Sequence, residues 1–314
     1  MNKRLIAILK KEGLEHFAGV LTEQGVTDSI LSELSDNDLR EMGIDKLGER
    51  KRLLTAFAAT GAAQNEPGAM VEIQGGGPLL NQVDVPTSHG WRRIELRLPD
   101  GREVGDFAIG KFAVTMEEWQ VVREWGVANG FEMAIGRSGG STHPVTVVNW
   151  YDVLKWCNAK SEMEGLKVAY TIAGGPYRKG DSDVVSCDWK SGGYRLPAQA
   201  EWAWAARGGV KSCGSTYAGG DDLGAVGWFK GNSGGMAHPV GQKAPNELGL
   251  FDMSGNVYEW CWDLFGGTLY PGQRVRCGGS WEHESPCCTL GQDCLKPESR
   301  YTTTGFRLAL VPSR

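Results

Sequence analysis

Sulfur and imidazole side chains gather near the carboxyl end of the chain. Four of the eight cysteines lie between Cys277 and Cys294, and His283 lies among them. Three of the four cysteines and His283 belong to the stretch RVRCGGSWEHESPCC, which begins at Arg274. Thiolate and imidazole groups are ligands that suit soft ions such as copper(I). The same side chains could instead be ordinary parts of a surface loop. The stretch therefore predicts either a metal site or a displayed surface.

A group of oxygen donors precedes this stretch. Asp252 and Glu259 stand seven residues apart in DMSGNVYE, with main-chain carbonyl groups between them. Carboxylate and carbonyl oxygens suit a hard cation such as calcium. The alternative is that Glu259 pairs with an arginine.

The composition of the 314 residues is that of an ordinary globular protein of about two domains, with 41% hydrophobic and 23% charged residues. A net charge of −5 and the lack of a basic run argue against nucleic acid. The apolar run LIAIL is too short for a signal peptide, and no stretch approaches the roughly 20 apolar residues of a membrane helix. We therefore expect a cytoplasmic protein that binds neither nucleic acid nor a membrane.

Residues 1–60 show the apolar spacing of helices. Leu14, Phe17, Ala18 and Leu21 follow the helical period, and Ser35 with Asp38 forms a shortened capping box. This pattern predicts a small bundle of five short helices. Residues 61–82 are rich in Gly, Pro and Gln and predict a linker.

From residue 83 to residue 314, strand-like runs such as IELRLP and FAIGKFAV alternate with three predicted helices. The first begins at a capping box of Thr115 and Glu118, the second is NWYDVLKWCNAKSEMEG, and the third has Pro197 at its first turn and Gly208 just past its end. Little helix is expected beyond Gly209. This region predicts a compact α+β domain with much irregular structure, in which Trp202, Trp204, Trp260 and Trp262 pack in the core.

The string GLEHFAGVLTEQGVTDSILSELSDNDLREMGIDKLGERKRLLTAF resembles a sterile alpha motif (SAM) domain over nearly its whole length. The resemblance implies contact with a partner protein or self-association. A helical cap that does not polymerise is the alternative.

Six phrases in order resemble the formylglycine-generating enzyme (sulfatase-modifying factor) family, from Phe107 to Leu310: FAIGKFAVTMEEWQ, HPVTVVNWYDVLKWCNAKSE, GYRLPAQAEWAWAARGG, HPVGQKAPNELGLFDMSGNVYEWCWD, RVRCGGSW and TGFRLA. The resemblance implies a variant of the C-type lectin fold. The enzymes of that family oxidise a cysteine of sulfatases with molecular oxygen and hold copper(I) between two thiolates. In this chain Cys288 matches the second thiolate, but His283 stands at the first, so the resemblance leaves oxidase activity in doubt.

The alternative function of the same fold is ligand binding without catalysis. Variable proteins of diversity-generating retroelements resemble this chain in carrying a changeable segment between a GGSW phrase and a GFRLA phrase. Here that segment spans residues 281–304. Its predicted ligand-binding residues, for a protein or a small molecule, are Trp281, Glu282, His283, Glu284, Ser285, Cys287, Thr289, Gln292, Asp293, Lys296, Glu298, Tyr301, Thr302 and Thr303.

Three functions therefore stay open. The preferred one is a non-catalytic binding protein with SAM-mediated association, the second a copper oxidase using Cys288, His283 and Ser280, and the third an inert scaffold. The resemblance also implies at most one calcium, held by Asp252, Glu259 and the backbone oxygens of Gly255 and Val257. A second family calcium site lacks its asparagine near GWFKGNSGG.

Overall fold

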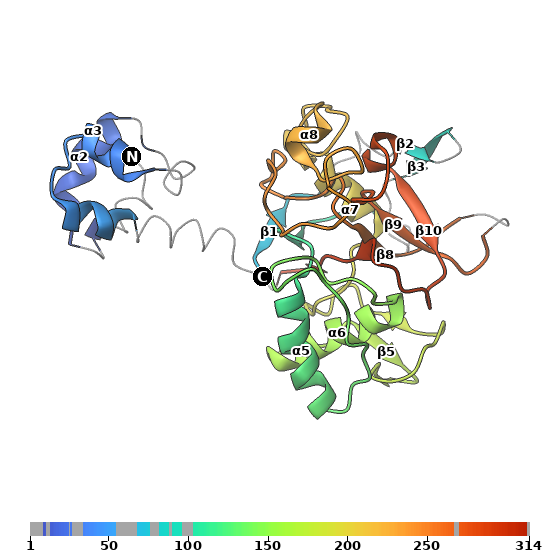
Figure 1. Cartoon of the computed structure of the whole chain (residues 1–314). Helices are drawn as coiled ribbons and strands as arrows, with labels where there is room; N and C mark the ends of the chain where they lie inside the picture. The colour runs from blue at the N-terminus through green and yellow to red at the C-terminus, as the bar shows by residue number, and fades with distance from the viewer. Residues whose placement is uncertain are drawn as a thin grey trace. The chain divides into compact units, whose positions relative to one another are not determined.

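A computed structural model of the chain describes residues 9–10, 13–24, 26, 34–54, 68–75, 82–87, 90–95, 103–266 and 270–312. The chain divides into two compact units, Met1–Glu66 and Pro67–Arg314 (Figure 1). In the described part, no helix is both long enough and apolar enough to cross a membrane.

The first unit is helical, as predicted. It holds the 3-10 turn η1 (Glu15–Phe17), α2 (Ala18–Glu23), α3 (Asp36–Glu41) and a helix over residues 47–54. The capping box at the start of α3 is confirmed: the Asp38 N–H donates to Ser35 Oγ, and the Ser35 N–H donates to the Asp38 carboxylate. Leu14 and Leu21 are buried in the core of this unit. The expected number of five helices rests partly on residues outside the described ranges and stays a prediction.

The predicted linker 61–82 is too long at its carboxyl end. Residues Met70–Ile73 form β1, which pairs antiparallel with β4 (Phe107–Gly110), and β12 (Ala309–Leu310) pairs with the other side of β4. Ile73 is buried against Phe107 in a core cluster. The strand was missed because its few apolar residues lie among glycines. Residues 61–67 lie outside the described ranges.

The three predicted helices of the second unit are confirmed as α5 (Met116–Ala128), α6 (Trp150–Met163) and α7 (Gln199–Ala206). Pro197 lies just before the N-cap of α7 and not, as the sequence had predicted, in its first turn. Each has its local signal. The Glu118 N–H donates to Thr115 Oγ1 at the start of α5, and α7 is followed by Gly208 at a φ of +87°. Helices α5 and α6 lie side by side (Figure 1). From Gly209 onward the only helices among the described residues are η4 (Gly209–Lys211), α8 (Leu223–Val226) and η5 (Ser285–Cys288).

Aromatic rings pack together where α5 and α6 meet. Trp119 stacks on Trp156 at 5.8 Å between ring centroids, and Phe306 meets both rings edge-on. Trp202 and Trp260 are fully buried and Trp204 is nearly so. The core packing predicted for these three is therefore confirmed. Trp262, the fourth, is half-buried and stacks on Tyr170.

A four-stranded sheet carries the candidate site, in the order β10-β9-β8-β11. It comprises β8 (Tyr258–Leu264), β9 (Arg274–Cys277), β10 (Gln292–Leu295) and β11 (Thr304–Gly305), which is parallel to β8. One face packs on α7: Trp202 Nε1 donates to Glu259 Oε2 at 2.6 Å, and the Gln199 N–H donates to Asp263 Oδ2 at 2.6 Å. Since side chains alternate along a strand, Arg274, Arg276 and Tyr258 lie on the other face.

Smaller sheets complete the unit. A hairpin of β2 (Gln82–Thr87) and β3 (Gly90–Glu95) forms one, and β5 (Tyr170–Ile172) between β6 (Gly175–Pro176) and β7 (Ser186–Cys187) forms another. Strand β2 lies near η5 and β10, on the side of the candidate site.

Candidate ligand-binding surface

The predicted segment 281–304 is more regular than its sequence suggests. It contains η5 and the strand β10, which pairs with β9 with Asp293 opposite Arg276. Strand β10 has only four residues, too few to show a strand period in the sequence. The segment leaves β9 through Gly279, where a Cβ atom would stand 2.7 Å from Cys288 Sγ and from the Cys287 carbonyl oxygen.

The guanidinium group of Arg276 lies beneath the segment. Arg276 Nη2 donates to Asp293 Oδ2 at 2.7 Å, Nη1 donates to Thr304 Oγ1 at 2.8 Å, and the guanidinium carbon lies 4.2 Å from the centroid of the Tyr258 ring. Arg276 thus joins β9 to β10 and β11 and stacks on β8. It fixes the middle of the segment, at Asp293, and its last residue, Thr304, relative to the sheet.

The first part of the segment is held by a neighbouring loop. Ser233 Oγ donates to the Trp281 carbonyl oxygen at 2.8 Å, and the Lys230 N–H donates to the His283 carbonyl oxygen at 3.0 Å. The Trp281 N–H donates to the Asn256 carbonyl oxygen at 2.9 Å. These main-chain contacts do not depend on which side chains the segment displays.

The last part of the segment is held against α6. Arg300 donates from Nε and Nη2 to Asp152 Oδ2 at 3.1 and 2.7 Å. The Val147 N–H donates to the Tyr301 carbonyl oxygen, and the Trp150 N–H donates to that of Pro297. Both ends of the displayed segment are therefore tied to rigid elements.

The fourteen predicted ligand-binding residues divide by exposure. Six are exposed: Glu282, Glu284, Lys296, Glu298, Tyr301 and Thr302. Five are half-buried: Trp281, His283, Ser285, Cys287 and Asp293. Three are buried and cannot reach a ligand without rearrangement: Thr289, Gln292 and Thr303. Gln292 is held by a hydrogen bond from the Gln199 amide of α7.

Two residues of the surface were missed from the sequence. Arg276 and Tyr258 lie outside the segment 281–304, yet they form its floor together with Asp293. The alternation of Arg274, Val275 and Arg276 in RVRC was the available signal, since it indicates a strand with one charged face.

The predicted copper pair does not fit copper(I). His283 Nδ1 is already hydrogen-bonded to Ser280 Oγ at 2.6 Å, and its ring meets Tyr258 edge-on. Cys288 is fully buried in an apolar cluster with Leu223 and Val226. This burial raises the pKa of the Cys288 thiol to about 12. A soft metal needs the thiolate, and these surroundings oppose its formation. Ser280 is fully buried as well.

We therefore expect copper(I) to bind the wild-type protein no more tightly than Cys288→Ala, as measured by competition with a copper(I) chelator. At pH 8 a thiol with a pKa near 12 is ionised to about one part in 10⁴. The exposed thiol of Cys213 gives the control, because Cys213→Ala should remove any weak surface binding. Stoichiometric binding lost only in Cys288→Ala, with aldehyde formed on a Cys-x-Pro-x-Arg peptide, would establish the oxidase instead.

The predicted calcium set fits a cation only in part. Asp252 Oδ1 is buried and has no partner among the described residues, and burial raises the pKa of this carboxyl to about 6. Glu259, in contrast, accepts from Arg307 at both oxygens, at 2.7 and 2.8 Å. Calcium takes six to eight oxygen ligands, and here it would lie beside a guanidinium group. The set as a whole, with Gly255 and Val257, therefore does not fit, and the described residues hold no cluster of three or more His, Cys, Asp or Glu suited to a metal.

Calcium should accordingly leave the thermal stability of the protein unchanged. We expect melting temperatures in millimolar calcium and in chelator to agree within about 1 °C, because a bound ion would stabilise the folded state by mass action. A rise of about 5 °C or more, lost in Asp252→Asn, would contradict this expectation.

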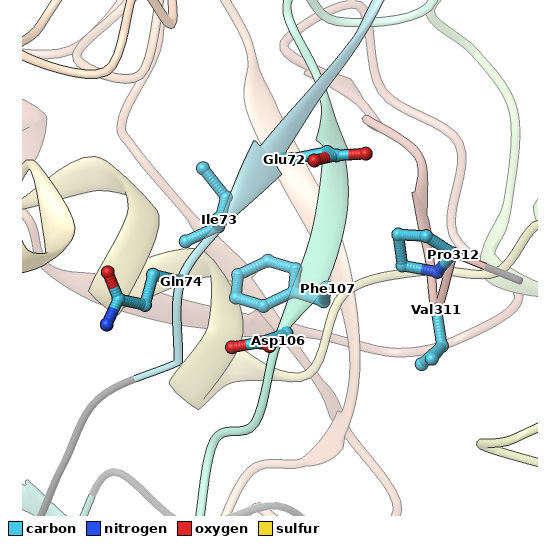
Figure 2. Close-up of a pocket in the computed structure, with 7 residues that line it drawn as sticks. All are labelled: Glu72, Ile73, Gln74, Asp106, Phe107, Val311 and Pro312. Atoms are coloured by element: carbon cyan, nitrogen blue, oxygen red, sulfur yellow. The ribbon is translucent and has the colours of Figure 1, made fainter. Parts of the chain in front are cut away.

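A cavity of about 540 Å³ lies elsewhere in the second unit, at the ends of β1 and β4 (Figure 2). None of the predicted site residues lines it. Its carboxylates, Glu72 and Asp106, point in different directions, and Asp106 Oδ1 accepts the Gly75 N–H. The lining residues are Glu72, Ile73, Gln74, Asp106, Phe107, Val311 and Pro312.

Comparison with known proteins agrees with this architecture. Residues 2–59 match the SAM domain (sterile alpha motif) family, and residues 56–311 match the sulfatase-modifying factor enzyme 1-like domain. The chain is 37% identical over 206 residues to the chaperone protein LppX of Paenibacillus barcinonensis, covering 57% of this chain and 70% of that protein. It is 36% identical over 148 residues to a formylglycine-generating enzyme of Streptomyces coelicolor, covering 37% of this chain but only 46% of the enzyme.

Among solved structures, variable protein 1 of Treponema denticola is similar, with a TM-score of 0.61 and 28% identity. The match covers 77% of this chain and 95% of that protein. The two family matches together account for both units of the chain. The protein belongs to the sulfatase-modifying factor family, with a formylglycine-generating-enzyme-like C-type lectin fold preceded by a SAM domain.

Proposed function

We propose that the protein binds a ligand without catalysis. The second unit presents the outer side chains of residues 281–304 to a protein or a small molecule, and the SAM domain associates with a partner or with another copy. One observation carries the proposal: the segment is tied down at both ends by contacts of its main chain and of Arg300, while six of its predicted side chains are exposed. A scaffold of this kind tolerates changes in what it displays.

The similarity to variable protein 1 of Treponema denticola supports a segment that differs between gene copies. If so, the differences should follow exposure. Among sister copies, changes should fall at positions such as Glu282, Glu298 and Tyr301, while the buried Thr289 and Thr303 stay constant. Sequencing sister copies and the flanking DNA tests this, with a neighbouring reverse transcriptase expected. A uniform segment, or changes spread equally over buried positions, would refute it.

The SAM domain should set the assembly state. We expect a protein lacking residues 1–60 to have a smaller mass in solution than the full chain, measured by light scattering during size exclusion. Leu53 and the other core residues of the first unit form a cluster of their own, so the truncation should leave the second unit folded. An unchanged mass at matched concentration would show that association does not run through this domain. The cytoplasmic location is proposed on the sequence alone and is tested by cell fractionation.

A further inference from the structure

Two buried thiols face each other under the candidate surface. Cys261 of β8 and Cys277 of β9 are 16 residues apart in the chain, and their sulfur atoms lie 3.9 Å apart. Both point to the face of the sheet that packs on α7, where they join Val275 and Trp202 in one core cluster. Neither thiol is used by the proposed ligand surface or by the copper pair considered above.

The geometry points to a disulfide. We propose that Cys261 and Cys277 form a cross-strand disulfide when the protein folds or opens in the presence of a low-molecular-weight disulfide such as oxidised glutathione. The strands are already paired, with Cys277 directly opposite Glu259, so Cys261 is its diagonal neighbour across the ladder. The sulfur atoms need to approach from contact distance to about 2.05 Å. This approach requires side-chain rotation and a small shift of adjacent strands.

The chemistry is two successive thiol–disulfide exchanges. The Cys261 thiolate attacks one sulfur of oxidised glutathione, forms a mixed disulfide and expels one glutathione thiolate. The Cys277 thiolate then attacks the Cys261 sulfur, closes the bond and expels the second glutathione. Two protein thiols are oxidised, one disulfide is reduced to two thiols, and the protons lost by the cysteines end on the released glutathione.

Burial sets the rate of this reaction. Cys261 is 0% exposed and Cys277 is 2% exposed. Desolvation raises the pKa of the Cys261 thiol well above its usual range, with a contribution from the contact with Cys277. The folded, reduced protein should therefore oxidise slowly, and oxidation should be fast during refolding. Once closed, the bond ties β8 to β9, which carries Arg276 and pairs with β10.

The test uses the full chain refolded from denaturant with oxidised glutathione or with a reductant. Before alkylation, the oxidised protein should be about 2 Da lighter than the reduced protein. After alkylation it should carry two fewer alkyl groups, and peptide mapping should find a single linked pair, joined through Cys261 and Cys277. Its melting temperature should exceed that of the reduced sample by roughly 5–10 °C. In Cys277→Ala the linked pair and the redox dependence of the melting temperature should disappear, while in Cys213→Ala both should persist.

Alkylation of both Cys261 and Cys277 in the refolded, oxidised wild-type protein would overturn the proposal. So would a cross-link that joins other cysteines. The wild-type peptide map decides the matter even if Cys277→Ala fails to fold, and Cys261→Ala provides a second variant with the same expected loss.

Discussion

Replacing Arg307 with methionine should lower the free energy of unfolding by about 3–5 kcal/mol. Arg307 is fully buried, and its guanidinium donates to both oxygens of Glu259 and to the carbonyl oxygens of Gly110, Lys111 and Phe251. Methionine fills much of the same volume but leaves the buried Glu259 carboxylate with Trp202 Nε1 as its one remaining donor among the described residues. Urea denaturation followed by tryptophan fluorescence measures the loss.

A second substitution separates charge from packing. Glu259→Gln in the Arg307→Met background should recover part of the lost stability, because the neutral amide can still accept from Trp202 while no charge is left unpaired. The matched control is Lys230→Met, which breaks an exposed pair with Glu284 and should leave the free energy of unfolding nearly unchanged, because water screens this pair. A cost for Arg307→Met as small as that for Lys230→Met would show that the buried pair does not hold the unit together.

Arg307 also explains why the phrase TGFRLA ends the displayed segment. Arg307 lies two residues beyond the end of β11, and its contacts reach the end of β4 and the loop at Phe251. The chain is thus fixed immediately after it leaves the candidate surface. Changes within 281–304 therefore need not propagate into β12.

The helices of the second unit could be predicted because their signals are local. Thr115 with Glu118 and Asn149 with Asp152 form capping boxes within a few residues, and the start of α7 follows Pro197 in the chain. The apolar pattern of Leu14 and Leu21 is equally local, and both residues are buried. Such signals do not depend on the rest of the fold.

The strands could not be predicted from local sequence signals in the same way. Strand β1 exists because its residues find β4, more than thirty positions away, and β10 exists because β9 offers it a partner. Strands of four residues carry no period of their own. The floor of the candidate surface was missed for this reason, since Arg276 joins the segment only through cross-strand contacts with Asp293 and Thr304.

Burial within the segment was also hidden in the sequence. Thr289, Gln292 and Thr303 have the same chemical character as Thr302, yet only Thr302 is exposed. Polar side chains give no indication of which face they occupy until the strand pairing is known. The sequence analysis therefore over-counted the residues of this segment that are placed to touch a ligand.

The division of the segment into exposed and buried residues predicts a large difference in how well each set tolerates substitution. Consider two libraries of the full chain, each randomised at six positions. One changes the exposed set Glu282, Glu284, Lys296, Glu298, Tyr301 and Thr302. The other changes the buried set Cys288, Thr289, Leu290, Gln292, Thr303 and Thr304. Both sets lie in the same segment, so chain position is matched and only burial differs.

The exposed library should retain at least about ten times more folded members than the buried one. Exposed substitutions usually change stability by less than about 0.5 kcal/mol, whereas buried ones each cost about 1–3 kcal/mol through unpaired polar groups or cavities. Display on yeast with protease challenge measures the folded fraction. The exposed library should then yield binders to an arbitrary protein target under selection, while the parent chain does not bind it.

The two measurements, protease resistance and selection of binders, test different parts of the proposal. Equal protease resistance of the libraries would show that the contacts from Ser233, Lys230 and Arg300 do not hold the segment as the structure describes. A well-folded exposed library that never yields a binder would instead contradict display as the function, because the scaffold would then tolerate change without presenting a usable surface. The proposal requires an exposed library that folds and also yields binders. In that case the sheet, held by the hydrogen bonds of Arg276 and Arg307, leaves the outer side chains free to recognise a ligand.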